Sequence, residues 1–300
     1  SSHSDAGYYS LPGGIHTRQA MTPSTAWTRR AWLAGAAALL TACASPTAPP
    51  PDSAAREVRV VSSGGFTAAY KILAPLYAQA SGVKIVSEYG ASIGNAPDSI
   101  PSRLARGEKF DIVILADSAF EKLVAEGKGV AGSRVDLGRS LIGASVKKGT
   151  PKPDISTVPA LKNALLNAKS VAYSASASGT YLSEELFAKL GVADRMKVTA
   201  KKIMSERVGA VVARGDAELG FQQASELLPF TELDYLGPIP DEVQQKVFFS
   251  AGVLQGAPNP EGAKRFIRYL ASPAAAGVIE STMVEGTRTS PAIHAAASAR

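Results

Sequence analysis

Few residues of this chain can bind metals or form disulfides. Its 300 residues include one cysteine and three histidines. A tetrahedral zinc site needs three or four ligands, most often Cys or His, and a disulfide needs two cysteines. We therefore expect no metal site, no disulfide framework and no cofactor.

The chain also lacks long apolar runs and blocks of like charge. Its 32 basic and 26 acidic residues give a net charge of +6, and no cluster of Lys and Arg marks a surface for nucleic acid. The apolar stretch Ala31 to Ala42 is too short for a transmembrane helix, which needs about 20 residues. With 45% hydrophobic residues, the chain can bury one large core or two ordinary ones.

The N-terminal part has the order of an export signal. Arg29 and Arg30 precede the apolar stretch, which ends in Leu40-Thr41-Ala42-Cys43. The two arginines are similar to a twin-arginine signal and the last four residues to a bacterial lipobox, in which the cysteine is lipidated and becomes the first residue after cleavage. A Pro-rich stretch at 45–51 follows as a tether. We predict a protein of the periplasm or cell envelope that touches the membrane only through Cys43.

Strands and helices alternate from Glu57 onward. The continuous apolar strand Phe110 to Leu115 indicates a parallel sheet that is covered on both faces. A second series of strands and helices follows the Gly- and Pro-containing stretch 149–153, which indicates a second α/β sheet. The expected strands are 58–61, 83–86, 110–115, 141–146, 170–173, one near Val198, 218–221 and 247–253. The expected helices are 66–79, 98–106, one from 117 or 118 to 124, 158–167, 179–190, 205–214, 260–270 and 273–281.

These patterns predict an α/β protein with two lobes and a mainly parallel sheet in each lobe. The chain is expected to leave the first sheet near Ser140 and to return to it near Val247. The predicted parts are an extension or tag with the export signal (1–42), the tether (43–56), a first lobe (57–138 and 246–290), a second lobe (139–245) and a tail (291–300).

Four segments carry a resemblance to a known family. They are Gly64–Tyr70, Phe110–Asp117, Ala177–Tyr181 and Gly215–Phe221, and their order is similar to that in molybdate-binding-like periplasmic solute-binding proteins. The resemblance implies a type II periplasmic binding fold, whose two lobes close on a small anion and deliver it to an ABC transporter permease. It further implies a monomer that is not an enzyme.

The same resemblance implies how the ligand is held. The family binds its oxyanion mainly through uncharged hydroxyls and backbone N–H groups at helix N-termini. Comparable turns at the ends of successive strands make the following residues the predicted ligand-binding set: Gly65, Phe66, Ser92, Ser178, Gly179, Arg207 and Gln223. An ordinary N-cap or tight turn is the alternative for each of them.

Three departures from the family pattern bear on the ligand. Gly65 stands where the family usually has a serine, Gln223 where many members have a tyrosine, and Arg207 where a small apolar residue is usual. A guanidinium suits a planar carboxylate, so an organic carboxylate is the expected ligand. The alternatives are a molybdate or tungstate ligand, an Arg207 that faces only water, and a strand end at Gln222 and Gln223 that faces only water.

A hydrolase is a further alternative. Gly90-Ala91-Ser92-Ile93-Gly94 matches the G-x-S-x-G pattern of a nucleophile elbow directly after a strand. Such a serine needs a base, and the single histidine after Cys43 is His294, in the Ala-rich tail. The sequence therefore favours a binding protein over a secreted serine hydrolase.

Overall fold

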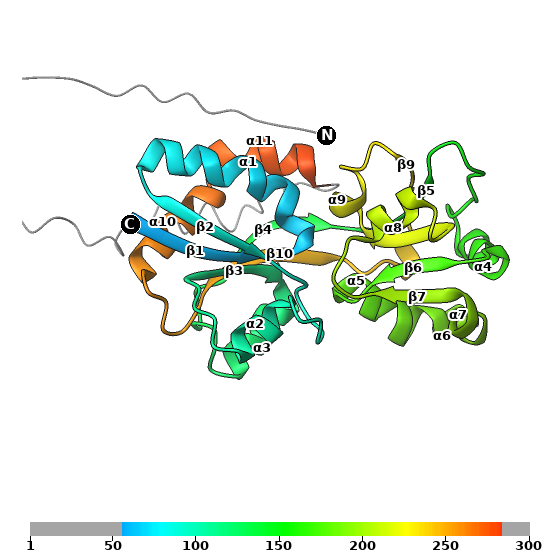
Figure 1. Ribbon diagram of the computed structural model, residues 1–300, viewed down its shortest axis with the longest axis horizontal. Helices are drawn as coiled ribbons and strands as arrows, with labels where there is room; N and C mark the ends of the chain where they lie inside the picture. Colours follow the sequence, from blue (N-terminus) through cyan, green and yellow to red (C-terminus); the bar gives the residue numbers. More distant parts are fainter. Residues whose placement is uncertain (1–55, 284–300) are drawn as a thin grey trace, which may run out of the picture. The chain divides into compact units, whose positions relative to one another are not determined.

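The computed structural model describes residues 56–283, which belong to one compact unit (Figure 1). The predicted export signal, Cys43, nearly all of the tether, and His294 lie outside the described residues. No helix between residues 56 and 283 combines the length and the apolar character that crossing a membrane requires.

The first sheet has the strand order β2-β1-β3-β10-β4. Its strands are β1 (Glu57–Ser62), β2 (Lys84–Tyr89), β3 (Ile112–Ala116), β4 (Val135–Ser140) and β10 (Val247–Val253). Five helices accompany it: α1 (Gly64–Ser81), α2 (Ile100–Ala105), α3 (Asp117–Ala125), α10 (Pro260–Leu270) and α11 (Pro273–Thr282). In Figure 1, α1 and α11 lie above this sheet and α2 and α3 below it, so both faces are covered. We call this sheet and its helices the first lobe.

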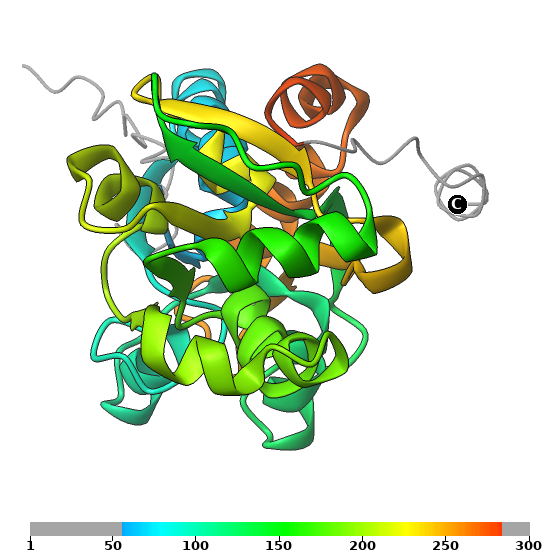
Figure 2. The ribbon, with the colours of Figure 1, turned by 90° about the vertical axis from the view of Figure 1, so that its right-hand side faces the viewer.

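The second sheet has the order β7-β6-β8-β5-β9. Its strands are β5 (Ile142–Lys147), β6 (Val171–Ser174), β7 (Ala200–Ile203), β8 (Leu219–Gln223) and β9 (Leu233–Pro238). Its helices are α4 (Val158–Asn167), α5 (Ala177–Tyr181), α6 (Phe187–Lys189), α7 (Ala193–Thr199), α8 (Val208–Arg214) and α9 (Ala224–Leu227), with a π turn at Leu182–Leu186 and a 3₁₀ turn at Asp241–Val243. Figure 2 views this second lobe with α4, α6 and α7 toward the reader.

The two-lobed α/β fold is confirmed, but the sheets are mixed and not mainly parallel. In each sheet two pairings are parallel and two are antiparallel. The antiparallel pairings all involve β10 in the first sheet and β5 in the second. These two strands enter directly from the other sheet, without the crossover helix that a parallel pairing requires.

Two further differences concern single elements. The strand expected near Val198 is present as β7, but it begins only at Ala200, because Val198 belongs to α7 and is 82% exposed. Strands β4 and β9 were not expected from the sequence. Both contain an aspartate and a glycine, so neither presents the β-branched run that marks a strand.

Candidate functional site

A pocket of about 150 Å³ lies between the two lobes. It is lined by Gly64, Thr67, Tyr89, Gly90, Ala91, Asp98, Ser174, Ala175, Ser176, Ile203, Met204, Ser205, Glu206, Arg207, Gln222 and Glu226. These residues stand at the carboxyl ends of β1, β2, β6, β7 and β8 and at the helices that follow them. Open α/β sheets bind their ligands at this end of the strands.

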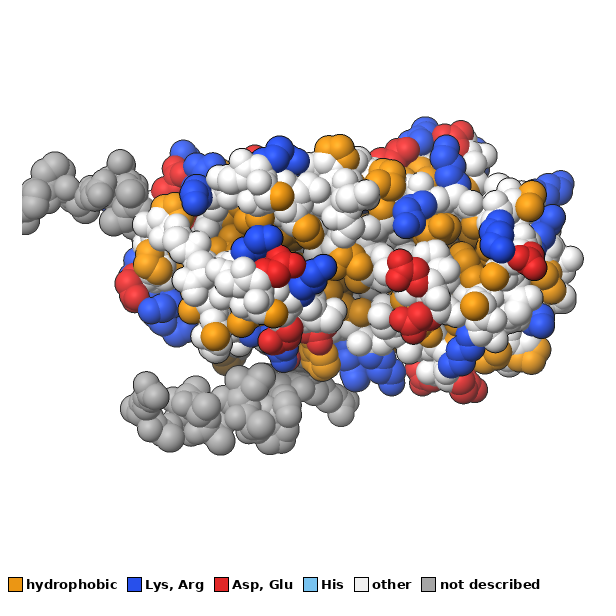
Figure 3. Space-filling model, turned by 90° about the horizontal axis from the view of Figure 1, so that it is seen from below, with side chains coloured by type: hydrophobic (Ala, Val, Ile, Leu, Met, Phe, Trp, Pro, Cys, Tyr) orange, Lys and Arg blue, Asp and Glu red, His pale blue; other side chains and the backbone are white. Residues whose placement is uncertain are grey.

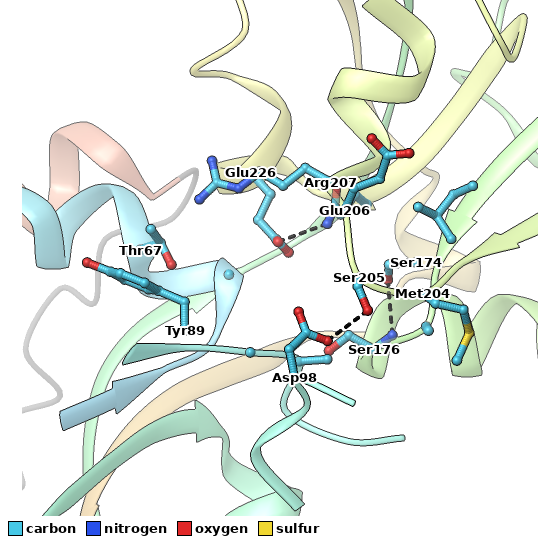
Figure 4. Close-up of a pocket in the computed structure, with 16 residues that line it drawn as sticks. Thr67, Tyr89, Asp98, Ser174, Ser176, Met204, Ser205, Glu206, Arg207 and Glu226 are labelled. Atoms are coloured by element: carbon cyan, nitrogen blue, oxygen red, sulfur yellow. Dashed lines mark hydrogen bonds between the residues drawn. The ribbon is translucent and has the colours of Figure 1, made fainter. Parts of the chain in front are cut away.

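Glu226 is the most unusual group in this pocket. The side chain lies in α9, directly after β8, and is only 8% exposed. Its Oε1 accepts a hydrogen bond from Gln222 Nε2 at 2.8 Å (Figure 4). Burial raises the pKa of Glu226 to about 7, and the charge of Arg207 opposes part of that rise. A carboxyl with this pKa can both accept and return a proton near neutral pH.

Arg207 is the cation of the pocket. Within residues 56–283, no carboxylate lies within 4.0 Å of its guanidinium nitrogens. The neighbouring Glu206 carboxylate is bound by both terminal nitrogens of Arg214, at 2.8 and 3.0 Å. Figure 4 shows the Arg207 side chain extending past Glu226 toward Thr67 and Tyr89. The guanidinium is therefore available to an anionic ligand.

Hydrogen bonds join the lobes around the pocket. Ser205 Oγ donates to Asp98 Oδ1 at 2.9 Å, and the backbone N–H of Ser92 donates to Ser176 Oγ at 3.2 Å. Deeper in the molecule, Ser225 Oγ donates to the Gly65 carbonyl at 2.7 Å. The lobes are thus in contact on several sides of the pocket.

Arg207 is the one member of the predicted ligand-binding set that lines the pocket. The other members are chain neighbours of lining residues or lie two or three positions away, and they are buried. A Cβ at Gly65 would overlap the Phe249 ring, and Phe66 is part of the core of the first lobe. Ser178 Oγ is hydrogen-bonded to Ser174 Oγ at 3.0 Å, and a Cβ at Gly179 would overlap the Ser174 carbonyl.

Gln223 differs from the rest of the set because both polar atoms of its amide group are buried and no described residue forms a hydrogen bond with them. Its side chain is therefore inside the protein and does not face water. Ligand binding by Gln223 and by the other buried members of the set stays a prediction.

The geometry around Ser92 does not support a nucleophile. Its hydroxyl oxygen accepts a hydrogen bond from the Ala116 backbone N–H at 3.0 Å, and the residue is 1% exposed. None of the residues from 56 to 283 is a histidine. The hydroxyl holds the turn after β2 against the end of β3.

Sequence reasoning missed Glu226 and misread its partner Gln222. Gln222 was considered as a strand end facing water, but it is 4% exposed. The available signal was the spacing of Gln222 and Glu226, four residues apart across the end of an apolar strand. That spacing alone could not indicate that Gly64 of the other lobe closes over the carboxyl group.

Comparisons with known proteins agree on the family. Residues 58–282 match the family described as bacterial extracellular solute-binding protein. A relative named aconitate isomerase, from Pseudomonas sp, is 45% identical over 232 residues, which are 77% of this chain and 88% of the relative. A relative named molybdate-binding protein ModA, from Azotobacter vinelandii, is 29% identical over 240 residues, 76% of this chain and 89% of that protein.

Solved structures show the same fold at low identity. The Azotobacter vinelandii periplasmic molybdate-binding protein has a TM-score of 0.60 and 19% identity, covering 75% of this chain and 97% of that chain. PEB3 of Campylobacter jejuni with bound L-phospholactate has a TM-score of 0.58 and 16% identity, with the same coverage. The predicted resemblance to molybdate-binding-like proteins is confirmed.

The expectation that the chain is not an enzyme is wrong. It is overturned by the 45% identical relative, which is named as an isomerase and matches most of this chain. The family resemblance rests on turns and strands that build the binding fold, and a catalytic carboxyl can be added to that fold without altering them. The chain belongs to the bacterial extracellular solute-binding protein family and has the type II periplasmic binding protein fold.

Proposed function

We propose that the pocket binds a small unsaturated polycarboxylate, with aconitate as the first candidate, and that Glu226 isomerises it by moving a proton. The observation that carries the proposal is the buried Glu226 carboxyl, with its pKa near 7, next to Arg207. The relative named aconitate isomerase supports the choice of substrate.

Aconitate has a methylene group between a carboxylate and a carbon–carbon double bond. A base that removes one methylene proton leaves an allylic carbanion, whose charge is shared with the carboxylates. Return of the proton to the other end of the allyl unit moves the double bond by one position. Because both ends carry a carboxylate, the product is again aconitate, and rotation before proton return exchanges cis for trans. One carboxyl group can perform both transfers, and its pKa is best placed near the working pH.

The surroundings of Glu226 fit this chemistry. The guanidinium of Arg207 can bind a substrate carboxylate through two hydrogen bonds and stabilise charge that spreads onto it. The first turn of α1, an 18-residue helix, adds a backbone N–H donor at Gly64 without a further charge. On the other side, Asp98 and Ser205 are tied to each other by their hydrogen bond.

Conversion of cis-aconitate to trans-aconitate by the purified protein, followed by proton NMR, tests the proposal. In D₂O the product should carry deuterium from solvent exchange at Glu226. We expect Glu226→Gln to lower kcat by about 10²- to 10⁴-fold, the usual effect of losing a general base. The control Glu280→Gln removes an exposed carboxylate on α11 and should leave kcat unchanged. A wild-type protein without turnover would refute the isomerase function.

Arg207→Ala tests the predicted carboxylate contact. Loss of a charge-assisted hydrogen bond costs about 1.5–3 kcal/mol, so the Kd for aconitate should rise about 10- to 100-fold. Titration calorimetry against aconitate, molybdate and tungstate separates the two ligand classes. The molybdate alternative would be favoured if the wild type bound molybdate tightly and did not bind polycarboxylates, and if Arg207→Ala left the Kd for molybdate unchanged.

We also propose, from family membership and the lobes that meet around the pocket, that the protein captures its carboxylate as a periplasmic monomer and passes it to an ABC transporter permease. Lipidation at Cys43 would hold it at the membrane. Cys43→Ser should then release the protein into the soluble fraction. Equal membrane retention of the variant and the wild type would exclude this anchor.

A further inference from the structure

The two oxygens of the Glu226 carboxyl group have different surroundings. Oε1 accepts the hydrogen bond from Gln222 Nε2 at 2.8 Å. It also lies against Gly64, where an added Cβ would overlap it. Oε2 receives no hydrogen bond from any described residue. The carboxyl group is therefore fixed through one oxygen.

Gln222 is itself fixed by the backbone. Its Oε1 accepts a hydrogen bond from the Val208 N–H, at the first residue of α8, at 3.0 Å. The oxygen end of the amide must face this donor, so the NH₂ end faces Glu226, and a flipped amide would set two donors against each other at Val208. The orientation of the amide thus follows from the fold.

We infer that Gln222 is a positioning residue that fixes Glu226 through Oε1 and leaves Oε2 as the atom that takes and returns the proton. The inference rests on the proposed isomerase function. In the neutral acid, Oε1 can still accept from Gln222 as the carbonyl oxygen, so the proton resides on Oε2. In the carboxylate, the same hydrogen bond stabilises the negative charge. Gln222 therefore holds the carboxyl group in one orientation through both halves of the proton transfer.

Other charged groups around Glu226 act on it differently. Arg207 faces it from the start of α8 and Asp98 from the loop before α2, across the pocket, while Glu206 is engaged with Arg214. Among residues 56–283, Gln222 is the group that donates a hydrogen bond to the Glu226 carboxyl. Its removal should change the proton affinity of Glu226 without removing a charge from the pocket.

The experiment replaces Gln222 by methionine, which has a similar length and no amide. The midpoint of the Glu226 titration is followed by carboxyl carbon NMR of glutamate-labelled protein, assigned by the signal missing in Glu226→Gln. We expect Gln222→Met to raise the midpoint by about one pH unit, which corresponds to the loss of one charge-assisted hydrogen bond. The pH dependence of kcat should shift in the same direction, and kcat at neutral pH should fall about 10-fold while KM changes less.

Two controls keep the result interpretable. Gln255→Met changes an exposed glutamine in the first lobe and should alter neither the midpoint nor kcat. Gln222→Glu retains an acceptor for the Val208 N–H and so preserves the local fold, which matters if the methionine variant unfolds. It should also raise the midpoint of the Glu226 titration, because a second carboxyl group then faces Glu226.

The inference would be overturned if the midpoint of the Glu226 titration were unchanged in both Gln222 variants. It would also be overturned if kcat fell only in proportion to a lower melting temperature. The NMR midpoint does not depend on turnover. A wild-type protein that fails to isomerise aconitate would refute the proposed function, and the midpoints would still decide whether Gln222 controls Glu226.

Discussion

Among single residues, Glu226 should make the stability of the protein depend on pH. Burial raises its pKa from 4.5 to about 7, so between these values the folded protein binds more protons than the unfolded chain. The free energy of unfolding should therefore fall by about 3 kcal/mol as the pH rises through this window, and the decrease should be complete above pH 7. Urea unfolding of the wild type and of Glu226→Gln between pH 4.5 and 8 measures this dependence. The free energy of unfolding of the variant should lack the decrease, because the variant has no carboxyl group at position 226. Parallel curves for the two proteins would contradict it.

Two glutamines, the buried Gln223 and the half-buried Gln244, allow a comparison. The Gln223 amide has no hydrogen-bond partner among the described residues. The Gln244 amide accepts a hydrogen bond from the Ile142 N–H at 2.8 Å and donates to the Ile142 and Ile239 carbonyls at 3.0 and 3.2 Å. We expect Gln223→Met to leave the melting temperature unchanged or to raise it, because burying an amide without hydrogen bonds destabilises the folded state. We expect Gln244→Met to lower the free energy of unfolding by about 1–3 kcal/mol. Thermal unfolding checks both. If Gln223 also contacts the ligand, its variant should bind aconitate more weakly, which calorimetry measures.

The site was predictable from the sequence only in part. Arg207 was identified because a cation at the start of a helix is visible in the sequence as a departure from the family pattern. Glu226 was not, because its raised pKa depends on burial by the other lobe, and the closing residue Gly64 is more than 150 positions away in the chain. Local patterns can indicate a charged residue, but its desolvation is a property of the folded structure.

Among the elements, those with strong local signals were predicted well. The apolar strand β3 is fully buried, and α4 has the predicted bounds Val158–Asn167, with Thr157 as the N-cap. The direction of β5 and β10 was missed, because an apolar strand has the same composition whether its neighbours are parallel or antiparallel. Strand direction depends on the connection that precedes the strand, and a direct crossing between lobes has no signature of its own.

The start of α1 provides a prediction at this scale. Gly64 is the first residue of the helix and its φ angle is not in the left-handed region, so alanine fits its backbone. Its Cβ would overlap the Glu226 carboxyl at the far end of that side chain, which would then have to leave the position set by Gln222. We therefore expect Gly64→Ala to lower kcat by about tenfold or more. The free energy of unfolding should fall by less than about 1 kcal/mol. The control Gly277→Ala, in α11 with open space around its Cβ, should leave kcat unchanged. Full activity of Gly64→Ala would mean that the Glu226 position is not critical.

At the scale of the whole described structure, the pocket is formed only where the lobes meet. On the face seen in Figure 3, Lys and Arg side chains are interspersed with Asp and Glu, so this face has no continuous field of one sign to draw an anion in. Ligand capture should therefore depend on Arg207 within the pocket and on closure of the lobes. The cross-lobe hydrogen bonds contribute to the closed state, which a ligand bound to both lobes would stabilise further.

Ser205→Ala tests this coupling. The Ser205 hydroxyl donates a hydrogen bond to Asp98 of the other lobe. One such hydrogen bond stabilises the closed state by about 1 kcal/mol, so its loss should raise the Kd of the ligand about fivefold. Most of the change should be a faster dissociation rate, because an open state releases ligand more readily. Propane-1,2,3-tricarboxylate, which has no double bond to move, allows calorimetry and stopped-flow kinetics without turnover. The control Ser281→Ala removes an exposed hydroxyl that donates a hydrogen bond to the Val278 carbonyl of α11, and this variant should bind the probe as wild type does. Equal dissociation rates for Ser205→Ala and wild type would mean that the lobes stay closed without this hydrogen bond, and that the contacts at Ser176 and Ser225 suffice to hold them.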